Sequence, residues 1–216
     1  MTARRTGHLK RIAVTGGIGS GKSTLIRELS SFGYAVYDAD RLVSDVVADP
    51  QIQQKIVSCL GTDAYSTDSN GQLIYQRQWV RDRIFNDASA RQELESIIHP
   101  ALSARFDRIC KELDLLAGGI WIFYEAALIF ESRREQDFDA VVSVVAPEKL
   151  RRQRLSSSRK LSETTMAAIF SAQVSDEVRR SKSHFVIENT LDTAHLKLQA
   201  MELIEQLRNF FHPQSH

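Results

Sequence analysis

The sequence predicts a doubly wound α/β fold built on a parallel five-stranded sheet. The first observation is a set of short apolar runs at Arg11–Thr15, Tyr34–Tyr37, Ile120–Tyr124 and Ala140–Val145, with a shorter fifth at Phe185–Ile187. None of them shows the polar alternation of a half-exposed strand, so we expect a sheet that is covered on both faces. The second observation is that helical patterns lie between the runs, which implies right-handed βαβ crossovers.

Two helical patterns are clear, and the second is expected to close over the sheet. One runs from Ser23 to Ser31 and carries Leu25 and Leu29. The other closes the sequence with the spacing of one helix face, at Leu196, Ala200, Leu203, Ile204, Leu207 and Phe211.

The long interval between the second and third strands predicts an inserted lobe. It covers residues 40–119 and contains several helical patterns, so we expect one domain over residues 1–216 with a helical insertion at about 60–116. Pro100 is expected in the first turn of a new helix, with His99 at the boundary. The polar stretch Thr62–Gly71 is typical of a loop.

Charge and composition argue against several classes of protein. The chain has 28 basic and 27 acidic side chains and a net charge of +1, which disfavours a protein that coats nucleic acid or membranes. Residues 1–11 lead into no signal-peptide core, and the longest apolar stretch, Gly118–Phe130, is too short to span a bilayer. Cys59 and Cys110 fit no metal-ligand spacing and are expected to be small buried residues. We expect a cytoplasmic protein that is a monomer or a weak homo-oligomer.

The strongest functional signal follows the first strand. Gly16-Gly-Ile-Gly-Ser-Gly-Lys-Ser23 fits the Walker A pattern G-x-x-x-x-G-K-[ST] and lies between an apolar strand and a predicted helix, as that pattern requires. Such a loop wraps a phosphate with its backbone N–H groups, and the helix N-terminus adds partial positive charge. Lys22 would reach the β and γ phosphates of ATP, and the Ser23 hydroxyl would hold Mg²⁺. A ligand-free glycine turn would not need Lys-Ser at these positions, so we predict nucleotide binding.

Carboxylates follow the second strand, in Asp38-Ala-Asp40. Parallel α/β proteins bind ligands beyond the carboxyl ends of their strands, and a kinase needs a carboxylate to orient an acceptor hydroxyl or take its proton. The alternative is that Asp40 is the N-cap of a helix over Arg41–Val47. Beside a Walker A loop we favour the functional interpretation.

Two glutamates follow the third strand. Glu125 ends the apolar run and resembles the acidic residue of a Walker B strand, which positions Mg²⁺ or its water shell. Glu131 comes after a further apolar stretch. Either glutamate is equally well explained as a loop residue that pairs with Arg133 or Arg134.

A basic cluster follows the fourth strand and comprises Lys149, Arg151, Arg152, Arg154, Arg159 and Lys160. Alone, such a run is typical of a solvated helix face. Beside a Walker A loop it predicts a lid over about residues 149–182, whose arginines neutralise the transferring phosphoryl group. Arg179 and Arg180 would add to it.

Taken together, several segments resemble the dephospho-coenzyme A kinase family. They occur in the family's order, cover nearly the whole chain, and are Thr15–Thr24, Asp38-Ala-Asp40, His99-Pro100, Leu128–Glu131, Ile169–Gln173 and Phe185–Asn189. Many kinases share the first segment, whereas the combination of the others is quite specific. The resemblance implies transfer of the γ-phosphoryl group of ATP to the ribose 3′-hydroxyl of dephospho-coenzyme A. It also implies a helical lobe that receives the coenzyme A portion.

The resemblance assigns roles residue by residue. Asp40 is the expected base or hydroxyl-orienting residue, and Asn189 is expected near the adenine of ATP. Asp38, His99 and Glu125 are expected on the substrate side, with Glu125 also a candidate for the metal. The alternative for His99 is a boundary residue that bonds a helix end. The residues expected to hold phosphates and Mg²⁺ are Gly17, Ile18, Gly19, Ser20, Gly21, Lys22, Ser23 and Thr24.

The sequence departs from the family pattern at two places. Ala127 stands where the family usually has proline, just after Glu125. Ser158 stands where the family has a lid arginine four residues beyond the one matched by Arg154. We expect Arg159, one residue later, to take over the catalytic role of that arginine through a local shift.

Two other functions compete with this interpretation. Another small-molecule kinase, for a nucleoside, a nucleotide or shikimate, would share the donor side of the site. A nucleotide-dependent switch without catalysis would need a partner surface in place of a substrate lobe, and the helix-rich insertion and Asp38-Ala-Asp40 disfavour it.

Overall fold

A computed structural model describes residues 8–85, 87–117, 120–158 and 162–213 of the chain. They form two compact units, one of Met1–Asp38 and Gly118–His216 and the other of Ala39–Ala117. Each unit has its own hydrophobic core, and we describe them in turn.

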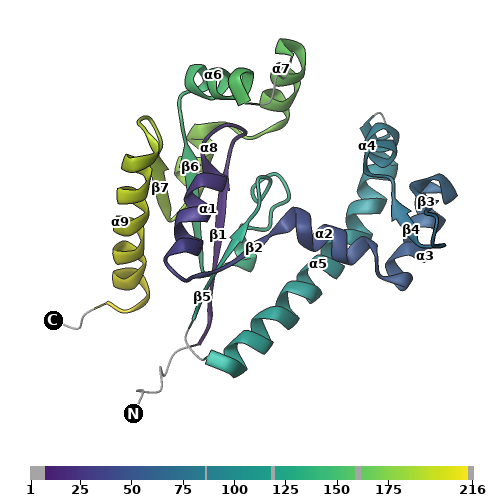
Figure 1. Cartoon of the computed structure of the whole chain (residues 1–216), viewed down its shortest axis with the longest axis horizontal. Coiled ribbons are helices and arrows are strands. Elements are labelled where there is room, and N and C mark those ends of the chain that lie inside the picture. The colour runs from purple at the N-terminus through teal and green to yellow at the C-terminus, as the bar shows by residue number, and fades with distance from the viewer. Residues whose placement is uncertain (1–7, 86, 118–119, 159–161, 214–216) are drawn as a thin grey trace. The chain divides into compact units, whose positions relative to one another are not determined.

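The first unit contains the predicted parallel sheet. Its strands are β1 (Lys10–Gly16), β2 (Ala35–Asp38), β5 (Trp121–Glu125), β6 (Ala140–Val145) and β7 (Phe185–Glu188). They lie in the order β2-β5-β1-β6-β7, and every neighbouring pair is parallel (Figure 1). The five-stranded doubly wound fold is therefore confirmed, and each predicted strand boundary lies within one residue of the observed one.

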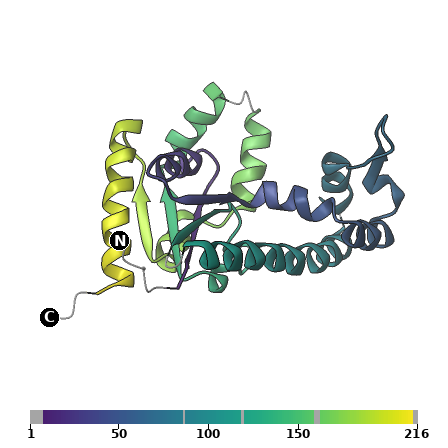
Figure 2. The same cartoon turned by 60° about the horizontal axis from the view of Figure 1, so that its bottom comes forward.

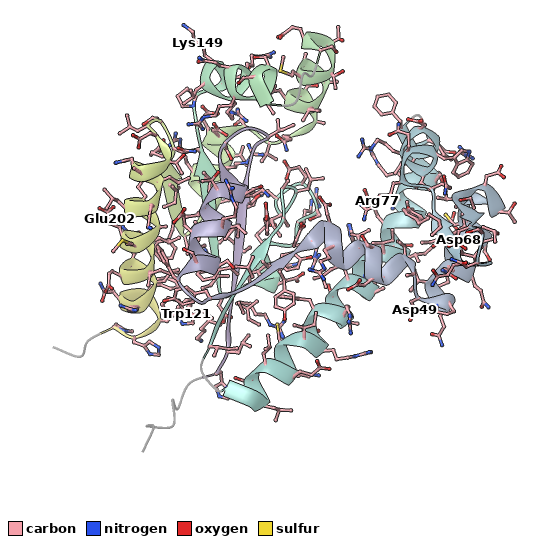
Figure 3. The ribbon with its side chains drawn as sticks, viewed as in Figure 1. Asp49, Asp68, Arg77, Trp121, Lys149 and Glu202 are labelled. Atoms are coloured by element: carbon pink, nitrogen blue, oxygen red, sulfur yellow. The ribbon has the colours of Figure 1, made fainter. Side chains whose placement is uncertain are left out.

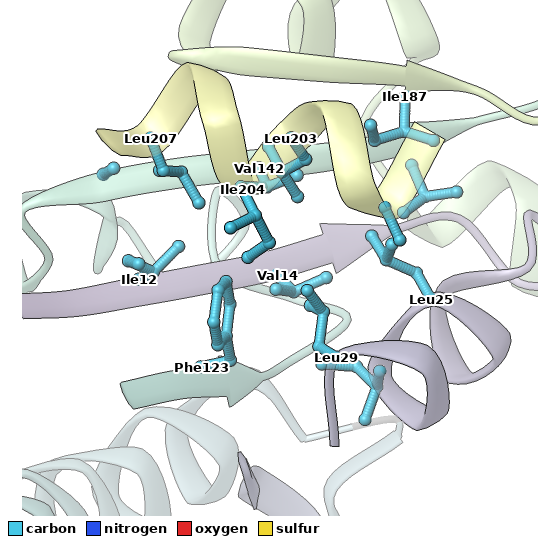
Figure 4. Packing of buried hydrophobic residues seen from close by; sticks show 14 of the residues in the cluster. Ile12, Val14, Leu25, Leu29, Phe123, Val142, Ile187, Leu203, Ile204 and Leu207 are labelled. Carbon is cyan, nitrogen blue, oxygen red and sulfur yellow. The ribbon is translucent and has the colours of Figure 1, made fainter. Parts of the chain in front are cut away.

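Alternate side chains of each strand point to opposite faces of the sheet, so strands that are apolar throughout present two apolar faces. Helices cover both of these faces. On one face α1 (Lys22–Ser31) and α9 (Thr193–Phe211) enclose a core that includes Val14, Phe123 and Val142 (Figure 4). Figure 2 shows α9 running along the sheet beside β7. On the other face α8 (Asp176–Lys182) contacts β6.

The strand order creates a switch point beside the central strand. From β1 the chain crosses through α1 to β2 on one side of the sheet, whereas β6 and β7 lie on the other side. Ligands of open α/β sheets bind where the strand order reverses, outside the carboxyl ends of the strands. The Walker A loop follows β1 at this place. Helices α6 (Glu148–Ser158) and α7 (Glu163–Ala172) lie beyond the same edge (Figure 1).

The second unit is mainly helical. It contains α2 (Ala39–Val47), α3 (Pro50–Leu60), α4 (Arg77–Phe85) and α5 (Ala88–Ala117), with a short 3₁₀ helix at Thr62–Ala64. Its core includes Val47, Ile56, Leu60, Val80 and Leu94. The unit is a compact body that covers Ala39–Ala117. Its role in binding the acceptor stays a prediction.

The polar stretch Thr62–Gly71 has a turn at Ser69–Gly71 but is not a loop throughout, so that prediction was only partly right. It contains β3 (Tyr65–Thr67), which pairs with β4 (Leu73–Tyr75) in an antiparallel hairpin. Asp68, labelled in Figure 3, accepts hydrogen bonds from the backbone N–H groups of Asn70 and Gln72 and so closes the turn. A three-residue strand followed by an Asx-type turn gives too short an alternation to stand out in the sequence.

The prediction of a helix boundary at His99-Pro100 was wrong. Helix α5 runs without interruption over 30 residues, with Pro100 inside it and His99 half-buried. Proline disfavours a helix interior because it lacks an N–H and its ring crowds the carbonyl group four residues earlier. The exposed position of Pro100 and the packing of the helix on both sides of it outweigh this preference.

The cysteines and the hydropathy of the helices bear on two expectations from the sequence. Cys110 is buried and Cys59 is half-buried, and neither forms a disulfide. No helix in the described ranges combines the length and apolar character needed to cross a bilayer.

Replacing Pro100 by alanine should stabilise the chain. The substitution restores a helical N–H donor and removes the ring from the interior of α5. We expect the free energy of unfolding to rise by about 1–3 kcal/mol, because the full helix preference of alanine over proline is partly offset by the greater entropy of the unfolded chain. Urea denaturation measures this, with Gln92→Ala on the same helix as a control that should change stability by only a few tenths of a kcal/mol. An unchanged or lower stability of Pro100→Ala would contradict this account of α5.

Candidate active site

The loop after β1 has the backbone of an anion-binding loop. Gly19 and Gly21 have φ angles of 76° and 100°, a region that residues with a Cβ rarely adopt. A Cβ at Gly17 would collide with the Arg151 guanidinium, and one at Gly21 would collide with the Asn189 carboxamide. Conformation therefore favours glycine at Gly19 and Gly21, and the neighbouring side chains leave little space for a Cβ at Gly17 and Gly21.

The loop presents unused hydrogen-bond donors. In the part of the chain that the structure describes, the N–H groups of Gly19, Gly21, Lys22 and Ser23 donate to no protein acceptor. The Ser20 hydroxyl is buried and also has no partner there. Lys22 and Ser23 open helix α1, whose first N–H groups lack partners within the helix. Such a set of donors fits the phosphate chain of a nucleotide.

Asn189 and Arg154 support the second half of the loop. Asn189 directly follows β7, is 5% exposed, and donates from its Nδ2 to the Ser20 carbonyl oxygen at 2.7 Å. Arg154 lies beside it and donates to the carbonyl oxygens of Gly19 and Ser20 at 3.4 Å each and to that of Asn189 at 3.2 Å. Both residues thus hold the backbone of the loop. The expected contact of Asn189 with adenine stays a prediction.

Lys22, Ser23 and Glu125 form a compact polar cluster. The Lys22 ammonium and the Ser23 hydroxyl both donate to the same carboxylate oxygen of Glu125, with the hydroxyl at 2.9 Å. Glu125 ends β5 and pairs in register with Val14 of β1, which places its side chain beside the start of α1. The Lys22 and Glu125 side chains are only 15% and 13% exposed. Burial strengthens the attraction between them relative to a surface ion pair.

The fit of Mg²⁺ rests on the chemistry of this cluster. Mg²⁺ takes oxygen ligands, keeps several waters, and is usually held by one or two protein groups together with substrate phosphates. The Ser23 hydroxyl and the Glu125 carboxylate are oxygen donors that already share one hydrogen bond. Among the described residues no group of three His, Cys, Asp or Glu side chains gathers as a metal site, and a site shared with nucleotide phosphates requires none.

The two aspartates of Asp38-Ala-Asp40 lie in different units. Asp38 is the last residue of β2 and stands opposite Glu125 in the strand register, so both belong to the carboxyl edge of the sheet. Asp40 lies in the first turn of α2 in the second unit. The alternative that Asp40 is an N-cap was wrong, because α2 begins at Ala39. A carboxylate in the first turn still interacts favourably with the helix dipole.

Two further polar residues of the second unit, Arg77 and the predicted His99, lie on helices. Arg77 at the start of α4 donates to the Asp40 carbonyl oxygen at 3.0 Å and also to the Ser44 hydroxyl, which ties α4 to α2. His99 lies within α5, so its alternative role as a residue at a helix boundary was wrong.

The basic cluster on α6 is not a simple solvated face. Lys149 is exposed on the outside of α6 (Figure 3), but Arg151 is only 7% exposed and lies over the Phe170 ring at 4.6 Å. Burial lowers the pKa of Arg151 and nearby Asp176 acts in the opposite direction; an arginine remains charged under these conditions. Arg159 and Lys160 lie outside the described residues, so the proposed shift of the lid arginine stays a prediction.

Glu131 pairs with a residue that the sequence did not suggest. Its carboxylate accepts from the backbone N–H of Val174 at 2.8 Å and from the Arg179 guanidinium at 3.4 Å. Arg179 is 1% exposed and also bonds the Val174 carbonyl oxygen and the Asp176 carboxylate. The alternative in which Glu131 pairs with Arg133 or Arg134 was therefore wrong, because Glu131 pairs with the buried Arg179 from a distant segment.

Sequence reasoning missed the residues that brace the loop from a distance. Gln173, at the end of α7, accepts a hydrogen bond from the Ile18 N–H at 3.0 Å. Thr15 donates from its hydroxyl to the Ala127 carbonyl oxygen at 3.1 Å and so ties β1 to the segment after Glu125. No spacing or composition signal in a single sequence links positions more than a hundred residues apart. Only the segment Ile169–Gln173 of the family resemblance pointed to the first of them.

Substituting Gly21 should test the loop geometry against a matched glycine. Gly21 and Gly33 both have positive φ, but an added Cβ has open space only at Gly33. We expect Gly33→Ala to cost about 1–2 kcal/mol from backbone strain alone. Gly21→Ala should cost more and should weaken MgATP binding at least about tenfold, because it displaces Asn189 from the Ser20 carbonyl group. Thermal unfolding and calorimetric titration measure both effects. Equal binding by the two variants would contradict the assignment of this loop.

Comparison with known proteins agrees with this site. The family model for dephospho-CoA kinase, CoaE, matches residues 10–195. A dephospho-CoA kinase of Chlorobium luteolum is 31% identical over 198 residues, which cover 91% of this chain and 90% of that protein. One of Methylococcus capsulatus is 33% identical over 189 residues, covering 87% and 91%.

Solved structures share the fold. TT1252 from Thermus thermophilus superposes with a TM-score of 0.75 at 28% identity and covers 93% of this chain and 98% of its own. A shikimate kinase of Acinetobacter baumannii has a TM-score of 0.53 at 16% identity, covers 94% of each chain, and supports the fold alone. The family model spans most of the sequence, from β1 into α9, and includes the loop, Glu125 and Asn189. The chain therefore belongs to the dephospho-CoA kinase family.

Proposed function

We propose that this protein transfers the γ-phosphoryl group of ATP to the ribose 3′-hydroxyl of dephospho-CoA and releases CoA and ADP. The observation that carries the proposal is the cluster of Lys22, Ser23 and Glu125 beside a loop with unused N–H donors. In a member of this family, such an arrangement supports a nucleotide site whose triphosphate lies against the loop.

The proposed reaction is an in-line displacement at phosphorus. The 3′-hydroxyl oxygen forms a bond to the γ-phosphorus as the bond from that phosphorus to the β–γ bridging oxygen breaks, and ADP leaves. The hydroxyl proton passes to a carboxylate, for which Asp40 is the candidate. Asp38, His99 and Glu125 are proposed to lie on the acceptor side.

The chain's charged groups would act mainly by electrostatics. Lys22 is proposed to leave Glu125 and contact the β and γ phosphates, where its charge offsets the negative charge of the transition state. Ser23 and Glu125 would hold Mg²⁺, which would supply positive charge beside the phosphates. The lid segment at about 149–182, with Arg159, is proposed to complete this positive environment.

The proposal also covers the compartment in which the protein acts and its oligomeric state. A reaction between two small molecules needs neither nucleic acid nor a membrane, and the net charge of +1 suits a cytoplasmic protein without such partners. We propose a monomer or a weak homo-oligomer.

The acceptor should be identified by ADP release. With ATP and Mg²⁺ present, we expect ADP formation to depend on dephospho-CoA and to be at least about a hundredfold slower with a nucleoside, a nucleoside monophosphate or shikimate, because those acceptors lack the binding energy of the pantetheine portion. A coupled assay and mass detection of CoA measure this. Comparable turnover with one of the other acceptors would contradict the assignment of dephospho-CoA as the substrate.

Replacing Asp40 by asparagine should separate its role from that of Asp38. Asparagine keeps size and hydrogen bonding but removes the charge and the ability to take a proton. We expect Asp40→Asn to keep its thermal midpoint and ATP affinity and to lose kcat by roughly 10²–10⁴-fold. Asp38→Asn, two residues away at the end of β2, is the comparison variant that tests the opposite assignment of the two carboxylates. If Asp38→Asn loses turnover and Asp40→Asn retains it, the two roles are reversed.

A further inference from the structure

The first half of the phosphate loop is held by a side chain from a distant helix. The Ile18 N–H donates to the Gln173 carboxamide oxygen at 3.0 Å, whereas four other N–H groups of the Gly17–Ser23 segment have no protein acceptor among the described residues. Gln173 lies at the C-terminal end of α7, and its own N–H caps that helix by donating to the Phe170 carbonyl oxygen. The end of α7 is thus bonded directly to the loop.

A second side chain confines the same peptide group. The Arg151 guanidinium lies so close to Gly17 that an added Cβ would collide with it, and the Gln173 oxygen lies 3.4 Å from that Cβ position. Arg151 is itself placed by the Phe170 ring and by an ion pair with Asp176 at 3.7 Å. The Gly17–Ile18 peptide therefore contacts one cationic and one neutral polar side chain, both fixed from outside the loop.

The segment that carries Gln173 is anchored by the buried Arg179 and the half-buried Glu131. Glu131 bonds the N–H of Val174, the residue after Gln173, and Arg179 bonds both Glu131 and the Val174 carbonyl oxygen. The Arg179 side chain is 1% exposed and that of Glu131 18%, so water competes little for these bonds. The carboxamide of Gln173 is consequently presented to the loop from a segment that is held on both sides of Val174.

Gln173 is nevertheless not packed into the core. It is half-buried and borders a cavity of about 470 Å³ that is also lined by Glu148, Arg151, Asp176 and Arg180. Its substitution therefore leaves the hydrophobic core intact, which separates its effect on the loop from an effect on folding.

We infer that Gln173 is a positioning residue that orients the Gly17–Ile18 peptide for the phosphates of ATP and couples helix α7 to the occupied loop. The inference rests on the proposed function only in placing a nucleotide at this loop. A neutral acceptor suits the position, because it holds the N–H group without adding negative charge beside the phosphates. A carboxylate there would hold the N–H group and repel the nucleotide.

The experiment compares Gln173→Ala, Gln173→Asn and Gln173→Glu with Ser171→Ala, an exposed residue on the same helix whose hydroxyl bonds only within α7. Hydrogen exchange of the Ile18 amide is measured by NMR without nucleotide. Calorimetry then gives the affinity for ADP and for a non-hydrolysable ATP analogue, and steady-state kinetics gives kcat and both KM values.

For Gln173→Ala and for Gln173→Asn, whose side chain is one methylene too short, we expect faster Ile18 exchange and a kcat reduced about three- to tenfold, the loss of one hydrogen bond. The KM for the acceptor and the thermal midpoint should stay as in Ser171→Ala. Gln173→Glu should keep Ile18 protected and yet bind the ATP analogue about tenfold more weakly, with the loss diminishing at high salt.

Two results would overturn the inference. One is wild-type Ile18 exchange and wild-type kcat in Gln173→Ala or Gln173→Asn. The other is wild-type affinity of Gln173→Glu for the ATP analogue. The exchange and binding measurements need no acceptor, so a wild-type enzyme that fails to use dephospho-CoA would refute the proposed function and leave this test intact.

Discussion

The Walker A loop of the first unit depends on one steric constraint. Side chains from other segments occupy the space that a Cβ would need at Gly17 and Gly21. Arg151 and Gln173 lie against the first half of the Walker A loop, and Asn189 lies against Gly21. Any Cβ at Gly17 or Gly21 would force these groups apart. The parallel sheet brings them together, because the loop follows the central strand β1 while Arg151 and Asn189 follow the neighbouring strands on one side of it. The order of the strands thus decides which distant residues can hold the loop.

The second unit carries the residue proposed to act on the acceptor, whereas the first unit carries those proposed to bind ATP. The second unit has its own core and its own hairpin, and its chain enters directly after Asp38 at the end of β2. Asp40 is carried by the first helix of this unit, whereas the groups proposed to bind ATP belong to the sheet unit. A single residue, Ala39, lies between the two aspartates, so the chain passes from the sheet unit to the helical unit within one short segment.

The sequence was sufficient to predict the sheet and the conformation of the loop. It failed where tertiary packing outweighs a local preference, where strands are very short, and where contacts join distant segments. Apolar runs without alternation identify buried parallel strands, and the Walker A pattern states its own structural context. Pro100 misled the prediction of α5, since tertiary packing outweighed a local preference. The hairpin at Tyr65–Tyr75 has strands of three residues, too short for a periodic signal. The partners of Glu131 and Ile18 lie in segments that only the folded chain brings together.

The bond that Glu125 makes to both Lys22 and Ser23 has a consequence for which anions can enter the site. A bare anion that approaches Lys22 must compete with a carboxylate already in contact with it, and if it succeeds it leaves two negative groups side by side. A nucleotide that arrives with its own divalent cation replaces the lost positive partner of Glu125 at the same time. If ATP binds as proposed, Glu125 would therefore disfavour free phosphate and metal-free nucleotide relative to a nucleotide that carries a divalent cation.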